Sequence, residues 1–315
     1  FYDKMISEGS GKMTDLIKLD TEKNNQRTID IDILSTQEIL QKINDEDQTV
    51  ASIVSKSIPK ISALVDQIVE RMQKGGRLFY IGAGTSGRLG VLDAAECPPT
   101  YGVDKGLVVG IMAGGDNAMF IAQEGAEDSL ELARGDLSQY QINENDTVIG
   151  LAASGRTPYV IGGLRYAREI GALTGAISCV QKAEISKFAD YPIEAVTGAE
   201  AIMGSTRMKA GTAQKLILNM ISTSVMIKLG KVYKNYMVDL KPTNKKLVVR
   251  SKNMIRTLTG VDDELAEKLY EESGHNVKKA LIMEIMDVDR QTAEEALMKG
   301  NGHIKRAIQV LGGDI

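Results

Sequence analysis

Five short apolar segments alternate with helical patterns in the middle of this chain, and no other feature of the sequence constrains the fold as strongly. Each segment runs into a small residue (Gly, Ala or Ser), and a helical pattern follows. Strands separated in this way by helices predict a parallel sheet covered on both faces. We therefore expect an α/β three-layer sandwich with a mostly parallel five-stranded sheet, in which a ligand binds at the carboxyl ends of the strands. The expected strands are Arg77–Gly82, Leu107–Met112, Thr147–Ala152, Leu173–Ser178 and Ile193–Thr197.

Helical patterns flank the predicted sheet on both sides. Apolar residues keep a helical period from about residue 35 to residue 74, where Gly75 and Gly76 end it. A long apolar helix is expected at about 207–228. Beyond the Lys-rich stretch 241–250, which contains Pro242, two segments resemble each other at a spacing of 27 residues and predict paired helical hairpins. The expected parts are a leader at 1–12 ahead of Met13, an N-terminal helical extension at 13–50, a sheet domain at 51–240 and a small all-helical (UBA-like) domain at 241–315.

The composition excludes several classes of function. A formal net charge of −4 and an isoelectric point near 5.5 disfavour nucleic acid or an anionic membrane as partner. No apolar run approaches the roughly 18 residues that a membrane span needs. Two cysteines, Cys97 and Cys179, cannot form a disulfide framework, and His275 and His303 lie far from both in sequence. We therefore expect a cytoplasmic protein without a structural metal or a cofactor.

The loop after the first predicted strand is the sharpest local motif. Residues 82–88 read Gly-Ala-Gly-Thr-Ser-Gly-Arg, which formally matches the dinucleotide-binding fingerprint. The acidic residue that should end the second strand is missing, and no Gly-Lys-Ser/Thr of a P-loop follows. Backbone N–H groups around Gly87, with the hydroxyls of Thr85 and Ser86, instead predict a phosphate cradle at a helix start. The alternative is a tight glycine turn with solvated hydroxyls.

Two further hydroxyl-rich loops support the phosphate interpretation. After the third strand, Ser154, Gly155 and Thr157 repeat the pattern of the first loop, and a proline follows at an expected helix start. Ser205 and Thr206 precede the long apolar helix. Three such loops in an α/β frame predict a phosphorylated small-molecule ligand held by hydroxyls and backbone dipoles.

Two carboxylates are candidates for acid–base chemistry. Glu96 comes just before Pro98 and Pro99, which we expect to end its helix, so that Glu96 would face the negative end of the helix dipole. Glu127 follows Gly125 near a new helix start, where an anion is favoured. These positions suggest a protonated Glu96 and an ionised Glu127. Taken alone, each is explained as well by a solvated helix end or acidic face.

Together these stretches resemble the sugar isomerase (SIS) domain, and more closely the N-acetylmuramic acid 6-phosphate etherase family. The resemblance implies an SIS-type fold and a homodimer, and the stretch 198–209 is similar to a signature shared with glucokinase regulatory proteins. The tail is similar to the family's small C-terminal module through less specific motifs. The segments that carry the resemblance are 44–47, 82–88, 93–101, 125–128, 152–159 and 198–215.

The family resemblance implies a reaction and roles for the candidate residues. Water cleaves the lactyl ether of N-acetylmuramic acid 6-phosphate, giving N-acetylglucosamine 6-phosphate and D-lactate, a step in the recycling of cell-wall sugar. By this resemblance Glu96 is the acid that assists the departure of lactate, and Glu127 is the base at C2. No histidine lies near Cys97 in sequence to activate it, so we interpret that thiol as packing.

Three other functions fit parts of the sequence. A sugar-phosphate sensor of the glucokinase-regulator or transcription-factor type would bind without turnover, but those regulators carry two SIS units or a DNA-binding motif. An aldose–ketose isomerase shares the C2 deprotonation. A nucleotide-dependent dehydrogenase is disfavoured by the missing ribose carboxylate.

Overall fold

The computed structural model describes residues 20–314 apart from residues 122, 124, 241 and 243. The predicted leader at 1–12 lies outside the described residues. The chain divides into two compact units: the first runs to Ala95 and resumes at Gly106–Ile221, and the second comprises Glu96–Lys105 and the chain from Ser222 onward. The predicted domain boundary near residue 240 falls inside the second unit.

A five-stranded sheet in the order β2-β1-β3-β4-β5 forms the centre of the first unit. Every pair of neighbours is parallel, and Leu78 lies opposite both Val108 and Thr147. The α/β prediction is confirmed, and the sheet is wholly rather than mostly parallel. Its last strand begins two residues earlier than the sequence pattern suggested, and it ends at Glu194. The strands are β1 (Leu78–Gly82), β2 (Val108–Met112), β3 (Thr147–Leu151), β4 (Leu173–Ser178) and β5 (Tyr191–Glu194).

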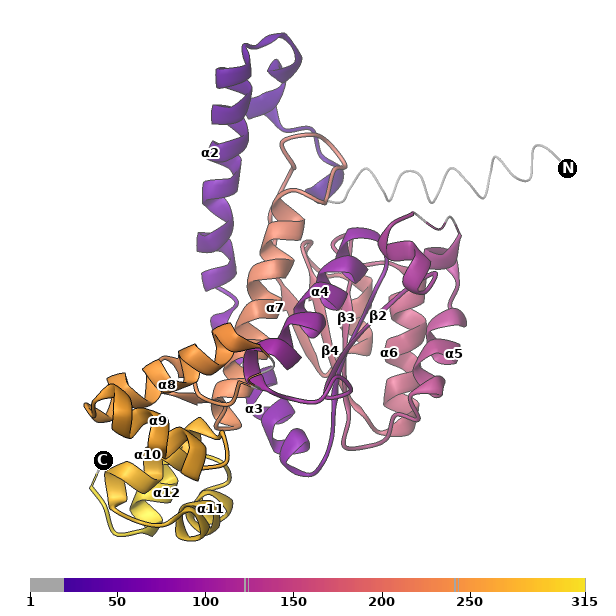
Figure 1. Ribbon diagram of the computed structural model, residues 1–315. Helices are drawn as coiled ribbons and strands as arrows, with labels where there is room; N and C mark the ends of the chain where they lie inside the picture. Colours follow the sequence, from indigo (N-terminus) through magenta and orange to yellow (C-terminus); the bar gives the residue numbers. More distant parts are fainter. Residues whose placement is uncertain (1–19, 122, 124, 241, 243, 315) are drawn as a thin grey trace, which may run out of the picture. The chain divides into compact units, whose positions relative to one another are not determined.

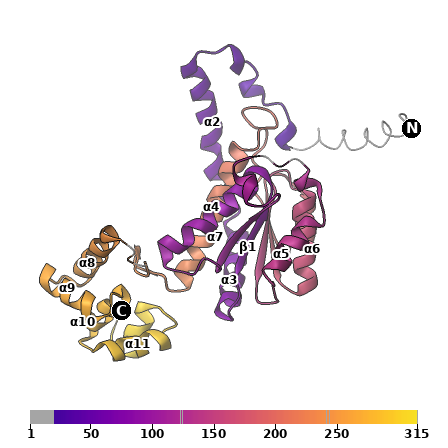
Figure 2. The same ribbon diagram turned by 45° about the vertical axis from the view of Figure 1, so that its right-hand side comes forward.

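Helices cover both faces of this sheet, because its central strands are apolar on both sides. Phe79 and Ile81 of β1 pack with α5 and α6 in one core cluster. On the opposite face, a Cβ added to Gly90 of α4 would lie 2.9 Å from Cβ of Tyr80, and one added to Gly175 of β4 would lie 3.1 Å from Leu64 of α3. Figures 1 and 2 show α5 and α6 on the one side and α3 and α4 on the other. These helices are α3 (Ile58–Gln73), α4 (Gly84–Tyr101), α5 (Leu132–Gln139) and α6 (Pro158–Ile170).

Helices α2 and α7 are longer, with 20 residues each. Helix α2 (Thr36–Ser55) begins with a capping box in which Ser35 and Glu38 bond each other's backbone N–H groups. Helix α7 (Lys209–Lys228) is the predicted long apolar helix and begins two residues later than expected. Three short 3₁₀ turns, Asp20–Glu22, Gln26–Thr28 and Ile31–Ile33, precede α2.

The prediction that Pro98 and Pro99 end a helix is wrong. Helix α4 continues through both prolines to Tyr101. A proline has the φ of a helix but lacks the N–H donor, and its ring crowds the carbonyl four residues earlier, so it weakens or bends a helix without necessarily ending it. The helix ends at Gly102, which takes φ +66° and donates its N–H to the carbonyl of Pro98 at 3.0 Å.

The second unit is helical, with one small hairpin of β6 (Val232–Tyr233) and β7 (Tyr236–Met237). The predicted repeat is visible as two helical pairs: Asp262 caps one by accepting the N–H of Leu265 at 2.8 Å, and Asp289 caps the other by accepting that of Thr292 at 2.8 Å. One apolar cluster joins the helices of this unit. They are α8 (Lys245–Thr259), α9 (Asp263–Glu272), α10 (Val277–Met286), α11 (Arg290–Lys299) and α12 (Ile304–Val310).

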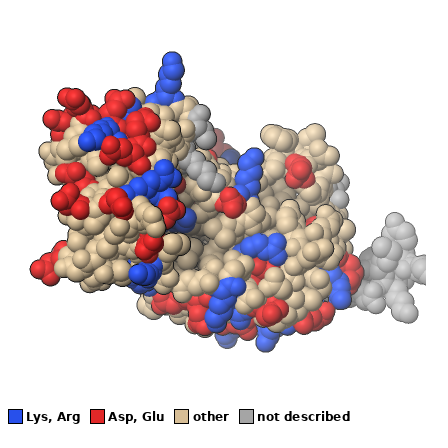
Figure 3. Space-filling view, turned by 60° about the horizontal axis from the view of Figure 1, so that its bottom comes forward, with Lys and Arg blue, Asp and Glu red and all other residues tan. Residues whose placement is uncertain are grey.

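The distribution of surface charge and the apolar character of the helices both bear on possible partners. Figure 3 shows acidic and basic side chains interspersed over one face, in keeping with a net charge of −4. Within the described ranges, no helix has both the length and the apolar character required to cross a bilayer.

Candidate active site

The strand order places the switch point of the sheet between β1 and β3. Helix α4 leaves β1 toward one face, whereas α6 leaves β3 toward the other, so the loops after these adjacent strands diverge at the carboxyl edge. A crevice opens where the connections diverge in this way, and open α/β sheets bind ligands there. Gly82 and Leu151 are register partners at this edge, so the first two hydroxyl-rich loops start side by side.

The first of these loops is a very tight turn. Helix α4 begins at Gly84, which has φ +53°, only two residues after the end of β1. A Cβ at Gly87 would lie 2.6 Å from the carbonyl oxygen of Gly82, so glycine lets the helix approach its own strand. Thr85 is half-buried, while Ser86 is 7% exposed and donates its hydroxyl to Oε1 of Gln214 at 2.9 Å.

The second loop lines a cavity of about 680 Å³, to which Ser154 and Thr157 both contribute. The loop is held by Gly155, whose φ is +69° and whose carbonyl accepts the N–H of Ile185 at 2.9 Å. A Cβ at Gly155 would lie 2.5 Å from Cβ of Ala183. Glycine at this position is therefore required by both the backbone conformation and the packing.

Glu127 lies between the two loops. It lines the 680 Å³ cavity together with Ser154 and Thr157, and it also lines a neighbouring cavity of about 160 Å³ together with Gly84. Its side chain is exposed, on a three-residue 3₁₀ turn (Ala126–Asp128) that follows Gly125 in the left-handed region. So short a turn has little dipole, and a role for Glu127 in the site is supported by the two cavities that it lines.

The third loop approaches the first through α7. A Cβ at Gly211 would lie 3.5 Å from the carbonyl oxygen of Thr206 and 3.6 Å from Cγ2 of Thr85. Ser205 and Thr206 are both half-buried. Each predicted phosphate-binding hydroxyl therefore belongs to the first unit, on loops at the carboxyl edge of the sheet.

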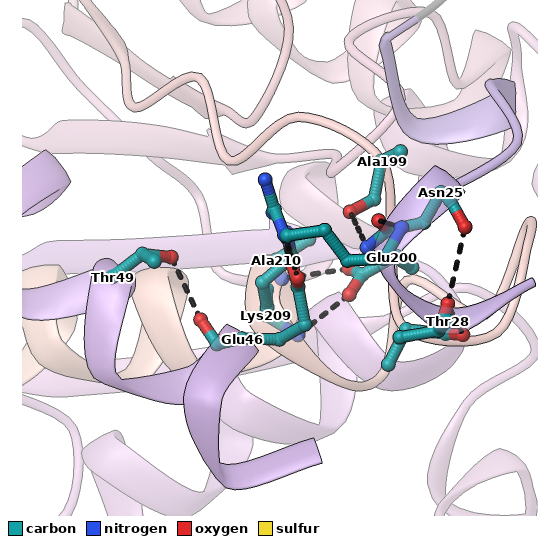
Figure 4. Close-up of polar contacts among 10 residues, drawn as sticks. Asn25, Thr28, Glu46, Thr49, Ala199, Glu200, Lys209 and Ala210 are labelled. Atoms are coloured by element: carbon teal, nitrogen blue, oxygen red, sulfur yellow. Dashed lines mark hydrogen bonds and ion pairs between the residues drawn. The ribbon is translucent and has the colours of Figure 1, made fainter. Parts of the chain in front are cut away.

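A buried cluster of charges holds the third loop against α2 (Figure 4). Nζ of Lys209 lies 2.6 Å from Oε2 of Glu46, and both side chains are 2% exposed. Arg27 donates from two nitrogens to the same carboxylate, at 2.5 and 2.8 Å. These two cations lower the pKa of Glu46 to about 2, the bond from Arg27 being the larger cause and burial opposing it.

Glu200 completes this cluster at the start of α7. Its carboxylate accepts the backbone N–H groups of Lys209 at 2.8 Å and Ala210 at 2.9 Å (Figure 4). Burial raises the pKa of Glu200, and the two backbone bonds partly offset that effect. Nearby, the hydroxyl of Thr28 donates to the carbonyl of Ala201 at 2.8 Å, so the N-terminal segment also fastens this loop.

Comparison with known proteins places this geometry in a family. A model described as "Glucokinase regulatory protein N-terminal SIS domain" matches residues 60–168, and one described as "SIS domain" matches residues 129–224. An N-acetylmuramic acid 6-phosphate etherase of Clostridium botulinum (strain Eklund 17B / Type B) is 60% identical, over 92% of this chain and 97% of that protein. The chain belongs to the N-acetylmuramic acid 6-phosphate etherase family. Proteins of the same name from Caldanaerobacter subterraneus subsp. tengcongensis (54% identical, 94% of this chain, 96% of that protein) and Clostridium beijerinckii (55%, 93% and 97%) agree.

Two arginines of this etherase-family chain line the larger cavity and were absent from the predicted site. Arg156 stands between Ser154 and Thr157 in the second loop, and Arg165 follows on α6. The guanidinium of Arg165 lies 4.5 Å from the ring centroid of Phe188. Arg156 stood within a recognised motif, whereas Arg165 looks in the sequence like any polar residue on a helix surface.

Glu96, the second predicted carboxylate of the etherase site, is exposed on α4 and belongs to the second unit. Because α4 continues to Tyr101, Glu96 lies before the last helical turn and not at the C-terminus. The prediction that Glu96 lies at the end of its helix is therefore wrong. Its pairing with Glu127 in one site stays a prediction that the geometry of either unit alone does not test.

The cysteines are both buried and free. Burial raises the pKa of the Cys179 thiol, whose Sγ lies 3.5 Å from the carbonyl oxygen of Ala210. In the part of the chain that the structure describes, no three His, Cys, Asp or Glu side chains are grouped to hold a metal ion.

Proposed function

We propose that this chain cleaves the D-lactyl ether of N-acetylmuramic acid 6-phosphate with water, releasing N-acetylglucosamine 6-phosphate and D-lactate in the recycling of cell-wall sugar. The names of the relatives support the substrate and the bond that is cleaved. The observation that carries the proposal is the cavity that joins Glu127 to the hydroxyls of Ser154 and Thr157. An acid–base group and a phosphate grip then face one small-molecule site.

The proposed chemistry is an elimination followed by an addition. In the open-chain sugar the aldehyde acidifies the C2 proton, and the lactyl ether at C3 is a β leaving group. Glu127 takes the C2 proton, the C3–O bond breaks, and Glu96 protonates the departing lactate oxygen. Water then adds at C3 of the unsaturated aldehyde, and a proton returns to C2. One water is consumed and no net redox change occurs, so two carboxylates suffice.

The substrate phosphate would be held by hydroxyls and backbone N–H groups from three loops. Thr85, Ser86 and Gly87 belong to the first loop, and Ser205 and Thr206 to the third. Ser154, Gly155 and Thr157 are the second loop, beside Glu127.

We also propose a cytoplasmic homodimer. Two buried, free thiols suit a reducing compartment. The family resemblance of the sequence is what supports the dimer, and sedimentation of the purified chain tests it.

The test is incubation of the purified chain with N-acetylmuramic acid 6-phosphate in ordinary and in ¹⁸O-enriched water. We expect D-lactate in both and the label at C3 of the sugar. Absence of lactate from a chain that still binds the substrate would favour a sensor instead. Label in the lactate would rule out the elimination–addition route.

A further inference from the structure

Gln214 is a polar side chain to which the proposed reaction gives no task, although it touches a predicted phosphate loop. It lies on α7, is 0% exposed, and its Oε1 accepts the hydroxyl of Ser86 at 2.9 Å. Its Nε2 is buried and has no hydrogen-bond partner among the described residues. A buried amide with one end bonded and one donor unmatched is costly, so its presence calls for an explanation.

The position of Gln214 relates it to two of the three loops. It follows Gly211 by three residues on α7, and a Cβ built on Gly211 would lie within 3.6 Å of both the Thr206 carbonyl oxygen and Cγ2 of Thr85. Its own contact is with Ser86, on the first turn of α4. The start of α7 thus packs behind the first loop, and Gln214 is the polar group that α7 presents to that loop.

A serine hydroxyl has a single proton, and this decides what Ser86 offers a ligand. In the contact described, Ser86 donates that proton to Gln214 and keeps only lone pairs for other partners. A phosphate is an acceptor and needs the proton. Rotation of the amide by half a turn exchanges Oε1 with Nε2 at almost no change in shape. Nε2 then donates to Ser86, Oε1 takes the position without a partner, and the hydroxyl proton becomes free to bond a ligand.

We propose that Gln214 is a positioning residue that sets the direction of the Ser86 hydroxyl, donating to it when the phosphate of a sugar phosphate binds. This inference rests on the proposed function, because it takes the phosphate grip as given. The resulting chain runs from the Gln214 amide to Ser86 and from Ser86 to the phosphate. Hydrogen bonds in such a chain strengthen one another when they are shielded from water.

Four variants test the proposal: Gln214→Met, Gln214→Glu, Ser86→Ala and the double variant Ser86→Ala/Gln214→Met. Methionine keeps the volume and removes both polar ends. Glutamate keeps the shape but, when ionised, only accepts, so it holds the Ser86 proton away from the ligand. Gln139→Met, at an exposed position on α5, is the matched control.

The measurements are the dissociation constants of N-acetylglucosamine 6-phosphate and of N-acetylglucosamine by calorimetry, with kcat and KM for D-lactate release. We expect Gln214→Met to weaken binding of the phosphorylated sugar about tenfold. Gln214→Glu should weaken it more, by about the contribution of one charge-assisted hydrogen bond. Binding of the unphosphorylated sugar and kcat should change little. The double variant should bind as Ser86→Ala does, because Gln214 acts only through Ser86.

Other results overturn the inference. If both variants bind the phosphorylated sugar as the wild type does, or if losses at Gln214 and Ser86 add, Gln214 does not act through Ser86. Equal weakening of both sugars indicates general loss of structure, which the urea midpoint of each variant checks. If wild-type chain neither turns over its substrate nor binds the phosphorylated sugar, the proposed function fails first, and this inference with it.

Discussion

Two glutamates of the first unit, Glu46 and Glu127, have opposite environments. Glu46 is 2% exposed and bonded to two cations, whereas Glu127 is exposed and lines two cavities. A buried carboxylate whose partners are all protein groups has nothing left to offer a ligand. One that lines cavities beside hydroxyl-rich loops is available for chemistry. The comparison suggests that Glu46 stabilises the loop that begins α7, and that Glu127 acts on the substrate.

The largest expected effect is on catalysis, at Glu127. Gln in its place keeps the shape and removes the base, so we expect D-lactate release to fall about 10²- to 10⁴-fold with the urea midpoint unchanged. Asp128→Asn is the matched control, because Asp128 is an exposed carboxylate lining the same cavity. Comparable losses in the two variants would mean that the charge of the cavity matters and not a particular base.

Breaking the buried ion pair between Lys209 and Glu46 should reduce the stability of the fold, whereas changing Glu127 affects catalysis. Lys209→Met leaves Glu46 buried with only the largely exposed Arg27, and we expect the free energy of unfolding in urea to fall by about 3 kcal/mol. Replacing Glu46 with leucine in the same chain should restore most of the loss, because the unpaired buried charge is then gone. If Lys209→Met unfolds like the wild type, the pair does not hold the loop.

Low pH should remove the stability that the buried carboxylate of Glu46 contributes. The pKa of Glu46 is lowered to about 2 from its ordinary 4.5, so its contribution is fully present above about pH 4.5 and is lost as pH falls toward 2. Glu200 has a raised pKa, so its contribution changes in the opposite sense, above pH 4.5. Urea unfolding between pH 4.5 and 3 should therefore show a steeper loss of stability in the wild type than in Glu46→Gln. Parallel declines would contradict the assignment.

The smallest expected effects are on substrate affinity, at single hydroxyls of the second loop. Ser154→Ala and Thr157→Val each remove one donor to a charged group, and we expect KM to rise about tenfold with kcat nearly unchanged. Ser138→Ala is a control, since Ser138 is an exposed serine on α5. A fall in kcat without a change in KM would place these hydroxyls nearer the reacting carbons than the phosphate.

The sheet could be predicted because its signals are local. Each strand is a short apolar run that ends at small residues, and the observed bounds of β1 to β4 agree with the pattern to within one residue. The end of α4 could not be predicted in the same way. Two consecutive prolines predict a stop, whereas the left-handed Gly102 ends the helix.

The site could be predicted only in part, for a related reason. Motifs identified the loops of Ser154 and Thr157, and the cavity beside them contains Glu127 as well. The pair of Glu46 with Lys209 joins positions 163 residues apart, and Gln214 meets Ser86 across 128 residues. Neither contact leaves a periodic or compositional signal, so only the folded chain reveals them.

Exchange of the C2 proton with solvent tests the central claim most directly. N-acetylmuramic acid 6-phosphate would be incubated in D₂O with the wild type, Glu127→Gln or Glu96→Gln. Proton NMR would follow the C2 proton while D-lactate release is measured. The account predicts deuterium at C2 with the wild type, exchange without lactate release for Glu96→Gln, and neither for Glu127→Gln. Exchange at the wild-type rate in Glu127→Gln would show that another group removes the proton.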